Sequence, residues 1–247
     1  MTATLAHIRR HPIKSVGGEE LASIALSPGR RLPGDREWAV LTESGERHAT
    51  GPQRWLPKSC FLRGAASLPL QAVTGGWCDD RIVLNHPDRA ELSLDPQHDG
   101  DLLLNWLRPL WPADAPAPTR LLHGAAIWTD QKWPWLSILS LGSLRDLEQR
   151  SGQQLGIHRW RGNLWIDGWE AFAERDLVGH TFQIGPVELR VTEQISRCEA
   201  PGANTDSGQR DIDMLATLKQ HYGDTSFGIF AEVVTAGTIT IGDKVQS

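Results

Sequence analysis

The chain is divided into many short apolar or alternating segments that end at glycine, proline or small polar residues, and this punctuation limits the fold. In Val187-Glu-Leu-Arg-Val191, apolar and polar residues alternate with the period of two that is typical of a half-buried strand. Further strands are predicted at 4–9, 21–27, 37–42, 68–74, 81–84, 90–94, 165–166 and 181–184. We therefore predict a β-rich α+β protein with an antiparallel sheet or barrel.

A few helices interrupt this pattern. Apolar residues recur at helical spacing over 101–110, 141–150 and 212–222, and the last two segments end at glycine. Strands at 229–234 and 238–241 are expected to pair across Ala236-Gly237 as a hairpin. The proline-rich stretch 112–118 is the best candidate for a linker, and a domain boundary is placed there.

Composition and charge limit the kinds of partner that the protein is expected to bind and the compartment in which it is expected. A formal net charge of −5 over 247 residues argues against nucleic acid or an anionic membrane surface as the main partner. The chain has neither an export signal at its start nor an apolar run long enough to span a bilayer, so a cytoplasmic protein is predicted. Eleven tryptophans, with clusters at 128–135 and 160–169, are expected mainly in the core.

Three cysteines, Cys60, Cys78 and Cys198, are too scattered for a disulfide framework or a zinc knuckle. Cys198 differs from the other two because it follows the alternating strand in a polar loop, where scaffolds present reactive groups. The adjacent Arg197 favours the thiolate, which binds soft metals or attacks electrophiles. From the local sequence alone, a small buried side chain remains an equal alternative.

The segment through Arg36 carries six basic and three acidic residues inside an acidic chain, which indicates a local anion site. Lys14 and Ser15 stand side by side after a strand, and Gly17-Gly18 would let backbone amides approach a phosphate. Arg161 and Asn163 flank a glycine at a predicted strand start, so their side chains are expected on the same face. Solvated loops and a surface ion pair are the ordinary alternatives to these interpretations.

Taken together, several short pieces resemble the MOSC family, the molybdenum cofactor sulfurase C-terminal domain, preceded by its N-terminal β-barrel domain. The likeness is strongest to bacterial and mitochondrial amidoxime-reducing component proteins. The pieces follow the family order over nearly the whole chain. They are Pro12-Ile-Lys-Ser15, Gly34-Asp-Arg-Glu-Trp38, Arg161-Gly-Asn163, Ala171-Phe-Ala-Glu174, Arg197-Cys198, Asp206-Ser-Gly208, Phe227-Gly228 and Ile241-Gly-Asp243.

This resemblance implies an N-terminal β-barrel-like domain at 1–118 and a MOSC β-barrel at 119–247. It implies that Cys198 is the catalytic residue and ligates molybdenum. Seven residues are assigned to the pterin cofactor and its phosphate: Lys14, Ser15, Arg36, Arg161, Asn163, Ser196 and Arg197. The implied enzyme is a molybdenum-dependent reductase of small N-hydroxylated compounds, with electrons from a separate ferredoxin-like or flavoprotein-like donor.

Some positions depart from the family pattern. His48-Ala-Thr-Gly-Pro52 stands where relatives carry a threonine-alanine-arginine motif, so Arg54 is a candidate for the missing contact. Ser196 replaces a cysteine of many relatives, and Glu-Ala-Pro-Gly after Cys198 replaces a more apolar stretch on the substrate side. Thr129-Asp-Gln-Lys132 only loosely follows the family's aspartate and hydroxyl contacts.

Two other functions stay open for the same thiol. Cys198 could carry a persulfide for sulfur transfer, or the protein could carry the cofactor without catalysing a reaction. Pyridoxal phosphate has a weak case, because Lys14 would need a lowered pKa and a partner for the ring nitrogen.

Overall fold

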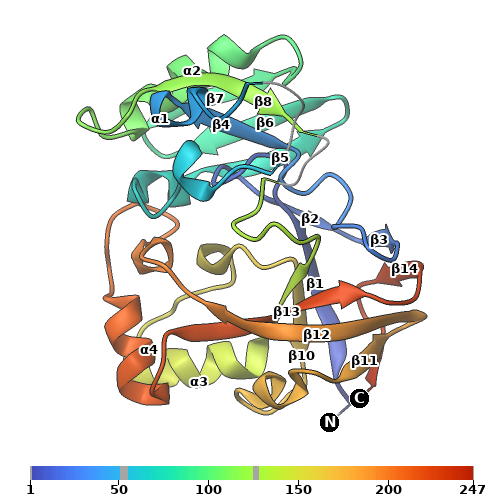
Figure 1. Ribbon diagram of the computed structural model, residues 1–247. Helices are drawn as coiled ribbons and strands as arrows, with labels where there is room; N and C mark the ends of the chain where they lie inside the picture. The colour runs from blue at the N-terminus through green and yellow to red at the C-terminus, as the bar shows by residue number, and fades with distance from the viewer. Residues whose placement is uncertain (1, 51–54, 125–127, 247) are drawn as a thin grey trace.

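The computed structural model describes residues 2–50, 55–124 and 128–246. A large mixed sheet with helices α3 and α4 forms the lower part of the molecule in Figure 1, and smaller sheets with helix α2 lie above it. Strands in the large sheet follow the order β15 (Val245–Gln246), β11 (Thr181–Ile184), β12 (Val187–Ser196), β13 (Ser226–Val233), β9 (Leu136–Ser140), β10 (Leu164–Asp167), β1 (Thr4–Arg10) and β2 (Glu19–Leu21). The predicted β-rich α+β fold is confirmed.

The large sheet curls until its last strand reaches its early one. Val245 pairs with Ile184 of β11, while its amide also donates to the Ala3 carbonyl at 2.8 Å. Leu5 exchanges two backbone hydrogen bonds with the turn before β15, to the Asp243 carbonyl and from the Gly242 amide. Alternating side chains from β1, β9, β11, β12 and β13 fill the enclosed core.

The upper part contains two smaller sheets around a second core. Strand β4 (Trp38–Thr42) pairs with β8 (Pro118–His123), and β5 (Thr74–Cys78), β6 (Arg81–His86) and β7 (Arg89–Leu94) form a meander. Helix α2 (Gly100–Leu107) buries its apolar face in this core. Strand β1 comes from the first predicted domain but lies in the large sheet, whereas β8 begins at residue 118 and pairs with β4 in the upper part. The two parts thus exchange chain segments, and the predicted boundary at residue 118 stays a prediction.

The predicted helices are confirmed, with small shifts at their ends. Helix α3 (Leu141–Ser151) begins where the Ser140 side chain accepts from the Ser143 amide, and it ends at left-handed Gly152. Helix α4 (Met214–Tyr222) begins two residues later than predicted because the Asp213 side chain caps it. The short helices are α1 (Glu43–Glu46) and the 3₁₀ turns η1 (Lys58–Cys60), η2 (Leu68–Ala72), η3 (Arg108–Leu110), η4 (His158–Trp160), η5 (Ala173–Leu177) and η6 (Ala200–Gly202). None of the helices in the described part is long and apolar enough to cross a bilayer.

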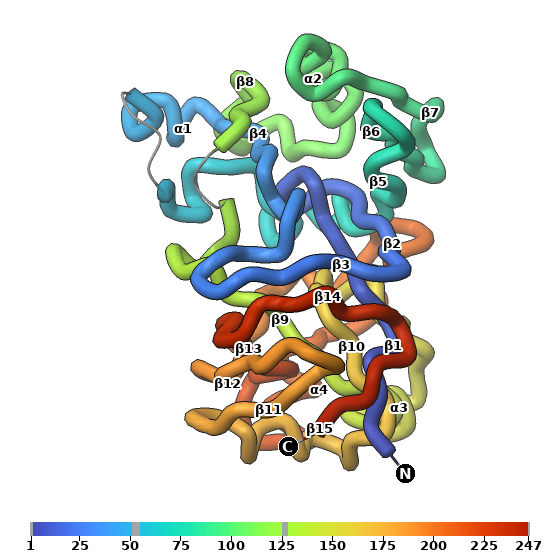
Figure 2. Tube along the Cα trace, turned by 90° about the vertical axis from the view of Figure 1, so that its right-hand side faces the viewer, coloured from blue at the N-terminus to red at the C-terminus, as the bar shows by residue number. Residues whose placement is uncertain are grey.

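Two predicted strand assignments were wrong. The segment predicted as a strand at 68–74 forms η2 instead, because Pro69 lacks the amide proton that a strand ladder needs and fits the first turn of a helix. Strand β14 (Gly237–Thr240) pairs with β3 (Ser23–Leu26) and not with β13 (Figure 2). The amides of Val234 and Thr235 both bond the Glu188 carbonyl, which turns the chain away from β13.

Candidate functional site

A cavity of about 630 Å³ lies where the segments of the upper part meet the ends of the large sheet. Its size falls within the roughly 300–1,000 Å³ typical of sites for small molecules and cofactors. All eight residues predicted for the site line it: Lys14, Ser15, Arg36, Arg161, Asn163, Ser196, Arg197 and Cys198. The fold therefore brings together side chains that are more than 180 residues apart in the sequence; their roles toward a ligand stay predictions.

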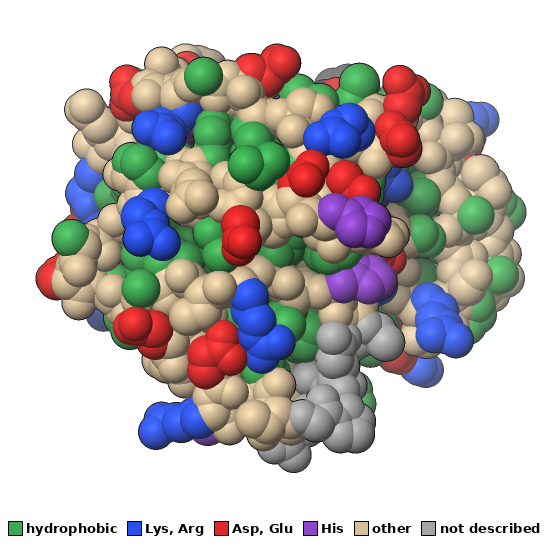
Figure 3. All heavy atoms as spheres, turned by 90° about the horizontal axis from the view of Figure 1, so that it is seen from above, with side chains coloured by type: hydrophobic (Ala, Val, Ile, Leu, Met, Phe, Trp, Pro, Cys, Tyr) green, Lys and Arg blue, Asp and Glu red, His purple; other side chains and the backbone are tan. Residues whose placement is uncertain are grey.

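The cavity wall is strongly cationic. Two acidic residues, Asp130 and Glu193, line it together with seven basic ones: Lys14, Arg36, Lys58, Arg63, Arg159, Arg161 and Arg197. The outer face over the smaller sheets, in contrast, mixes acidic and basic side chains (Figure 3). Positive charge is thus concentrated in the hollow of a chain whose net charge is −5, as an anionic ligand requires.

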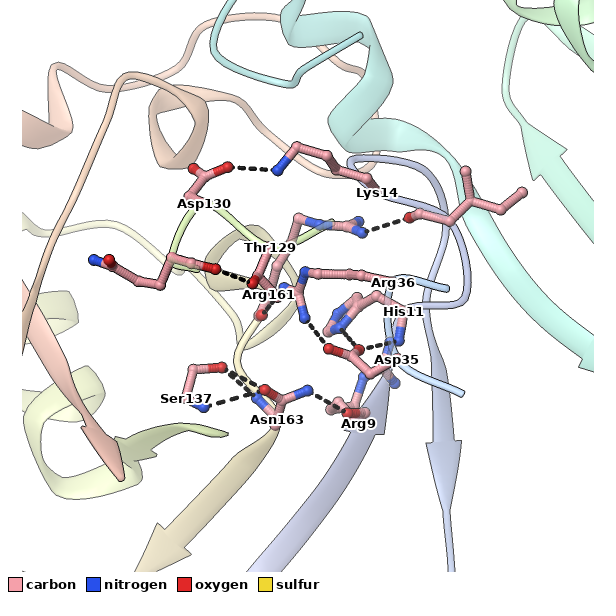
Figure 4. Close-up of polar contacts among 12 residues, drawn as sticks. Arg9, His11, Lys14, Asp35, Arg36, Thr129, Asp130, Ser137, Arg161 and Asn163 are labelled. Carbon is pink, nitrogen blue, oxygen red and sulfur yellow. Dashed lines mark hydrogen bonds and ion pairs between the residues drawn. The ribbon is translucent and has the colours of Figure 1, made fainter. Parts of the chain in front are cut away.

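Lys14 lies in the turn after β1, and its side chain is only 5% exposed. Its Nζ donates to Oδ1 of Asp130 at 2.5 Å (Figure 4). Burial lowers the pKa of Lys14, and the neighbouring Asp130 carboxylate opposes that shift. The sequence signal for Asp130 was the Thr129-Asp-Gln-Lys132 loop, which the family pattern matched only loosely.

Asp35 holds Arg36, another basic residue of the cavity wall, in place. One carboxylate oxygen of Asp35 accepts the His11 amide at 2.8 Å, and the other accepts from Nη1 of Arg36. Although burial alone would raise the pKa of Asp35, Arg36 and His11 hold it well below its usual range. Burial and the nearby Arg161 lower the pKa of His11, so His11 stays neutral.

Arg161 uses its guanidinium to hold the turn that presents Lys14 and Ser15. Nη1 donates to the Gly17 carbonyl at 2.6 Å, and Nη2 donates to the Ile13 carbonyl at 3.3 Å. Its own carbonyl accepts from Nη2 of Arg36 at 2.9 Å. Burial, reinforced by the charge of Arg36, lowers the pKa of Arg161 to about 9.

Asn163 links strands β9 and β1 through its side-chain amide. Oδ1 accepts from the amide and hydroxyl of Ser137 at 3.1 and 2.8 Å, and Nδ2 donates to the Arg9 carbonyl at 3.2 Å. Asn163 and Arg161 both line the cavity, but strand alternation is not the reason, because β10 begins only at Leu164.

Backbone strain is concentrated at the predicted site. Five residues other than glycine have a positive φ in the described part of the chain, and three of them are Ser15 at 63°, Arg36 at 51° and Arg161 at 51°. This left-handed conformation is unfavourable for residues with a Cβ and persists only where the surroundings enforce it. Such outliers gather at functional sites, which supports the assignment of these positions to the site.

Cys198 follows β12 in an exposed loop that Arg197 anchors. Nε of Arg197 donates to the Phe227 carbonyl at 2.8 Å, and Nη1 donates to the Trp160 carbonyl at 3.0 Å. Burial lowers the pKa of Arg197 to about 9. The described residues contain no group of three or more His, Cys, Asp and Glu side chains that could hold a metal ion.

Other cavity residues were not predicted from the sequence. Trp133, expected in the core, is 49% exposed and lines the cavity, with its ring 6.3 Å from that of Trp135. Arg63 and Gln71 line it from the segment between β4 and β5, and no local motif marked them. Arg54, the candidate for a missing arginine contact, lies outside the described residues.

Comparison with known families assigns both parts of the chain. Residues 2–104 match the MOSC N-terminal beta barrel domain, and residues 135–246 match the MOSC domain. Mitochondrial amidoxime reducing component 2 of Bos taurus is 25% identical over 98% of this chain and 82% of its own length. Molybdenum cofactor sulfurase 2 of Culex quinquefasciatus is 24% identical over 89% of this chain, which spans only 33% of that relative.

Solved structures resemble the chain more weakly. The YUAD protein from Bacillus subtilis superposes with a TM-score of 0.46 and 13% identity over 99% of this chain and 94% of its own. YiiM from Geobacillus stearothermophilus gives a TM-score of 0.36 and 18% identity over 45% of this chain and 52% of its own. The family assignment rests on the two sequence matches.

Proposed function

The chain belongs to the MOSC family and carries the MOSC N-terminal beta barrel domain as well, and we propose that it is a molybdenum-cofactor-dependent reductase of N-hydroxylated compounds. One observation carries this proposal: a free thiol and a cationic wall, built from distant parts of the chain, line the same cavity. The name of the bovine relative supplies the reaction class.

The donor set of the cavity fits a pterin cofactor with a phosphate. The Cys198 thiolate is a soft ligand suited to a metal of this kind, and the lysine and arginine side chains suit a phosphate. Nε1 of Trp160, a residue that lines the cavity, is buried without a partner among the described residues, so it offers a hydrogen bond to a ligand acceptor. Lys14, Ser15 and Arg36 would hold the phosphate end, and Ser196, Arg197 and Cys198 would hold the metal end.

Each residue then has a distinct task. Arg161 and Asn163 are positioning residues, because their donors already bond the backbone of residues 9, 13 and 17 and so orient Lys14 and Ser15. Arg197 fixes the loop that presents the thiol, and the apolar faces of Trp133 and Trp135 limit the access of water. When bound, the cofactor supplies two-electron redox chemistry.

The overall reaction consumes two electrons and two protons, breaks the N–O bond of the substrate, and yields the amine or amidine plus water. We propose that a separate redox protein of the ferredoxin or flavoprotein type delivers the electrons. The bovine relative is named as a component, which agrees with a system of several proteins.

Sulfur transfer is the second candidate, because Cys198 is exposed and one relative is named a molybdenum cofactor sulfurase. In that case the thiolate would carry a persulfide to an acceptor, and no metal would be retained.

Metal analysis separates these functions. The full chain is purified from a host that makes the cofactor, and molybdenum is measured by mass spectrometry in the native protein, in Cys198→Ser and in Cys78→Ser. Cys78 is the matched control, since it is also an exposed free cysteine but does not line the cavity. We expect near-stoichiometric molybdenum in the native protein and in the control, and its loss from Cys198→Ser.

An activity assay completes the test. The loaded protein is supplied with benzamidoxime and a reduced viologen dye, and benzamidine formation is measured. If the loaded protein forms no benzamidine with any electron donor, the proposed reductase is refuted and a cofactor carrier is the remaining interpretation. Absence of molybdenum together with sulfane sulfur on Cys198 would establish the sulfur-transfer alternative.

A further inference from the structure

The basic residues of the cavity divide into two classes by their partners. Five of the seven already bond acceptors of the protein: Lys14 to Asp130, Arg36 to Asp35, Arg159 to Asp211, and Arg161 and Arg197 to backbone carbonyls. The side chains of Lys58 and Arg63 have no hydrogen bond or ion pair with any described residue. Unused cationic capacity therefore lies on the side of the cavity formed by the segment between β4 and β5.

Gln71 adds an unused neutral donor on this side. Its side chain is buried, with 6% of the residue exposed, lines the cavity, and leaves Nε2 without a partner among the described residues. A Cβ placed on Gly64 would lie only 1.9 Å from this nitrogen, so the amide packs directly against the residue that follows Arg63. A buried donor without a partner is unfavourable, and an acceptor on a ligand would satisfy it.

The loop of the predicted metal ligand reaches the same place. The Cβ of Ala200 lies 3.5 Å from the Cβ position of Gly64, and η2, which carries Gln71, packs against η6, which begins at Ala200. Ala200 is two residues beyond Cys198. The free amide of Gln71 therefore lies beside the loop that presents the thiol, and Arg63 precedes the glycine in contact with both.

We propose that Arg63 and Gln71 form an oxyanion subsite that binds a carboxylate or phosphate group. This inference rests on the proposed function, and it assigns an acidic group to the N-hydroxylated substrate. The arginine fork can take both oxygens of the group, and the Gln71 amide can donate to one of them. Neither acidic residue of the cavity competes for the fork, because Asp130 bonds Lys14 and Glu193 bonds Gln131. The phosphate of the cofactor is the other source of the same chemistry.

Two matched probes test the subsite. Benzamidoxime and 4-carboxybenzamidoxime share the reacting group and differ only in a carboxylate. Each is titrated by calorimetry into the loaded full chain, and KM and kcat are measured in parallel. For Arg63→Ala we expect Kd and KM of the carboxylated probe to rise about tenfold to a hundredfold, as expected for loss of a charge-assisted hydrogen bond, with kcat retained. Values for benzamidoxime should stay within about twofold.

Two further variants keep the test independent of Arg63. Gln71→Leu removes the amide, and Gly64→Ala leaves it in the chain but displaces it; each should raise Kd of the carboxylated probe about threefold to tenfold. Arg108→Ala is the matched control, because Arg108 is exposed and does not line the cavity. Arg108→Ala should leave Kd and KM of both probes unchanged.

Molybdenum content separates the two sources of the anion. If the group belongs to the substrate, Arg63→Ala retains its molybdenum and only the carboxylated probe is affected. If it belongs to the cofactor, molybdenum falls and both probes are affected equally. Unchanged binding of the carboxylated probe with unchanged molybdenum in Arg63→Ala and Gln71→Leu would overturn the subsite. Calorimetry needs no turnover, so binding that depends on Arg63 without reduction would refute the proposed reductase alone.

Discussion

The two ends of the cavity are built in opposite ways. At one end the buried Lys14 bonds Asp130, and Arg161 bonds the backbone of the turn that carries Lys14. Three residues there, Ser15, Arg36 and Arg161, have a left-handed backbone conformation. Around Cys198 the thiol is exposed and makes no hydrogen bond with the described residues, although Arg197 and Glu199 on either side of it are bonded to the protein. The first end is organised before any ligand arrives, whereas the second leaves its thiol available. Ligand retention and fold stability should therefore depend on different residues.

Cys198→Ser should have the largest effect of these changes, and it should affect molybdenum binding but not the stability of the fold. Molybdenum content is expected to fall to near zero, because a hydroxyl is a poor ligand for a soft metal. The free energy of unfolding of the cofactor-free chain should change by less than about 0.5 kcal/mol, since the side chain is exposed. Urea titration and metal analysis measure the two quantities. A clear loss of stability in Cys198→Ser, together with the loss of molybdenum, would contradict the contrast between the two ends.

Arg161→Ala should have the next largest effect, and on the fold. The change leaves the Gly17 carbonyl without its donor, takes one of two donors from the Ile13 carbonyl, and is expected to lower the free energy of unfolding by about 3 kcal/mol. Urea titration measures it against Arg108→Ala, an exposed arginine. If the two variants unfold alike, the strained end is not organised by Arg161.

Ser15→Gly should act on stability and on ligand in opposite directions. Glycine accepts a φ of 63° without the cost of a Cβ, so the free energy of unfolding should rise by about 1 kcal/mol. The hydroxyl has no partner among the described residues and is predicted to bind the cofactor, so molybdenum retention should fall. Stabilisation without any loss of molybdenum would show that Ser15 holds nothing.

The smallest effect should be a pH dependence from Lys14. Because burial lowers the pKa of Lys14 below its ordinary value of 10.5, the unfolded chain binds more protons than the folded chain between those two pKa values. Stability from this group therefore rises as pH increases through that window. Lys14→Met should remove that rise from urea midpoints measured between neutral and alkaline pH, whereas Lys219→Met, at an exposed helix position, should keep it. An identical slope in native protein and Lys14→Met would contradict the assignment.

Prediction from sequence succeeded where local pattern decides the structure. The alternation at Val187–Val191 predicted a strand correctly, and the glycine after 141–150 predicted the end of a helix. It failed at Leu68–Ala72, where one proline outweighed the apolar run, and at β14, whose partner β3 lies more than 200 residues away. In both cases the decisive term was a backbone hydrogen bond, which composition does not report.

The candidate site followed the same division. The resemblance named eight residues that the fold brings to one cavity. Arg63 and Gln71 escaped because neither belongs to a motif, and Asp130 stood only in the loosely matching loop at 129–132. All three line the cavity because loops from distant segments meet there. The spacing of residues along the sequence does not indicate which distant loops come together in the fold.

Closure of the large sheet also orders the assembly of the protein. Strand β1 is made long before residues 242–245, yet part of its edge is covered only by those residues. Until those residues emerge, β1 presents unpaired amides and carbonyls that could recruit a strand of another nascent chain. A synthesis pause before residue 242 would therefore leave this edge open to misassembly.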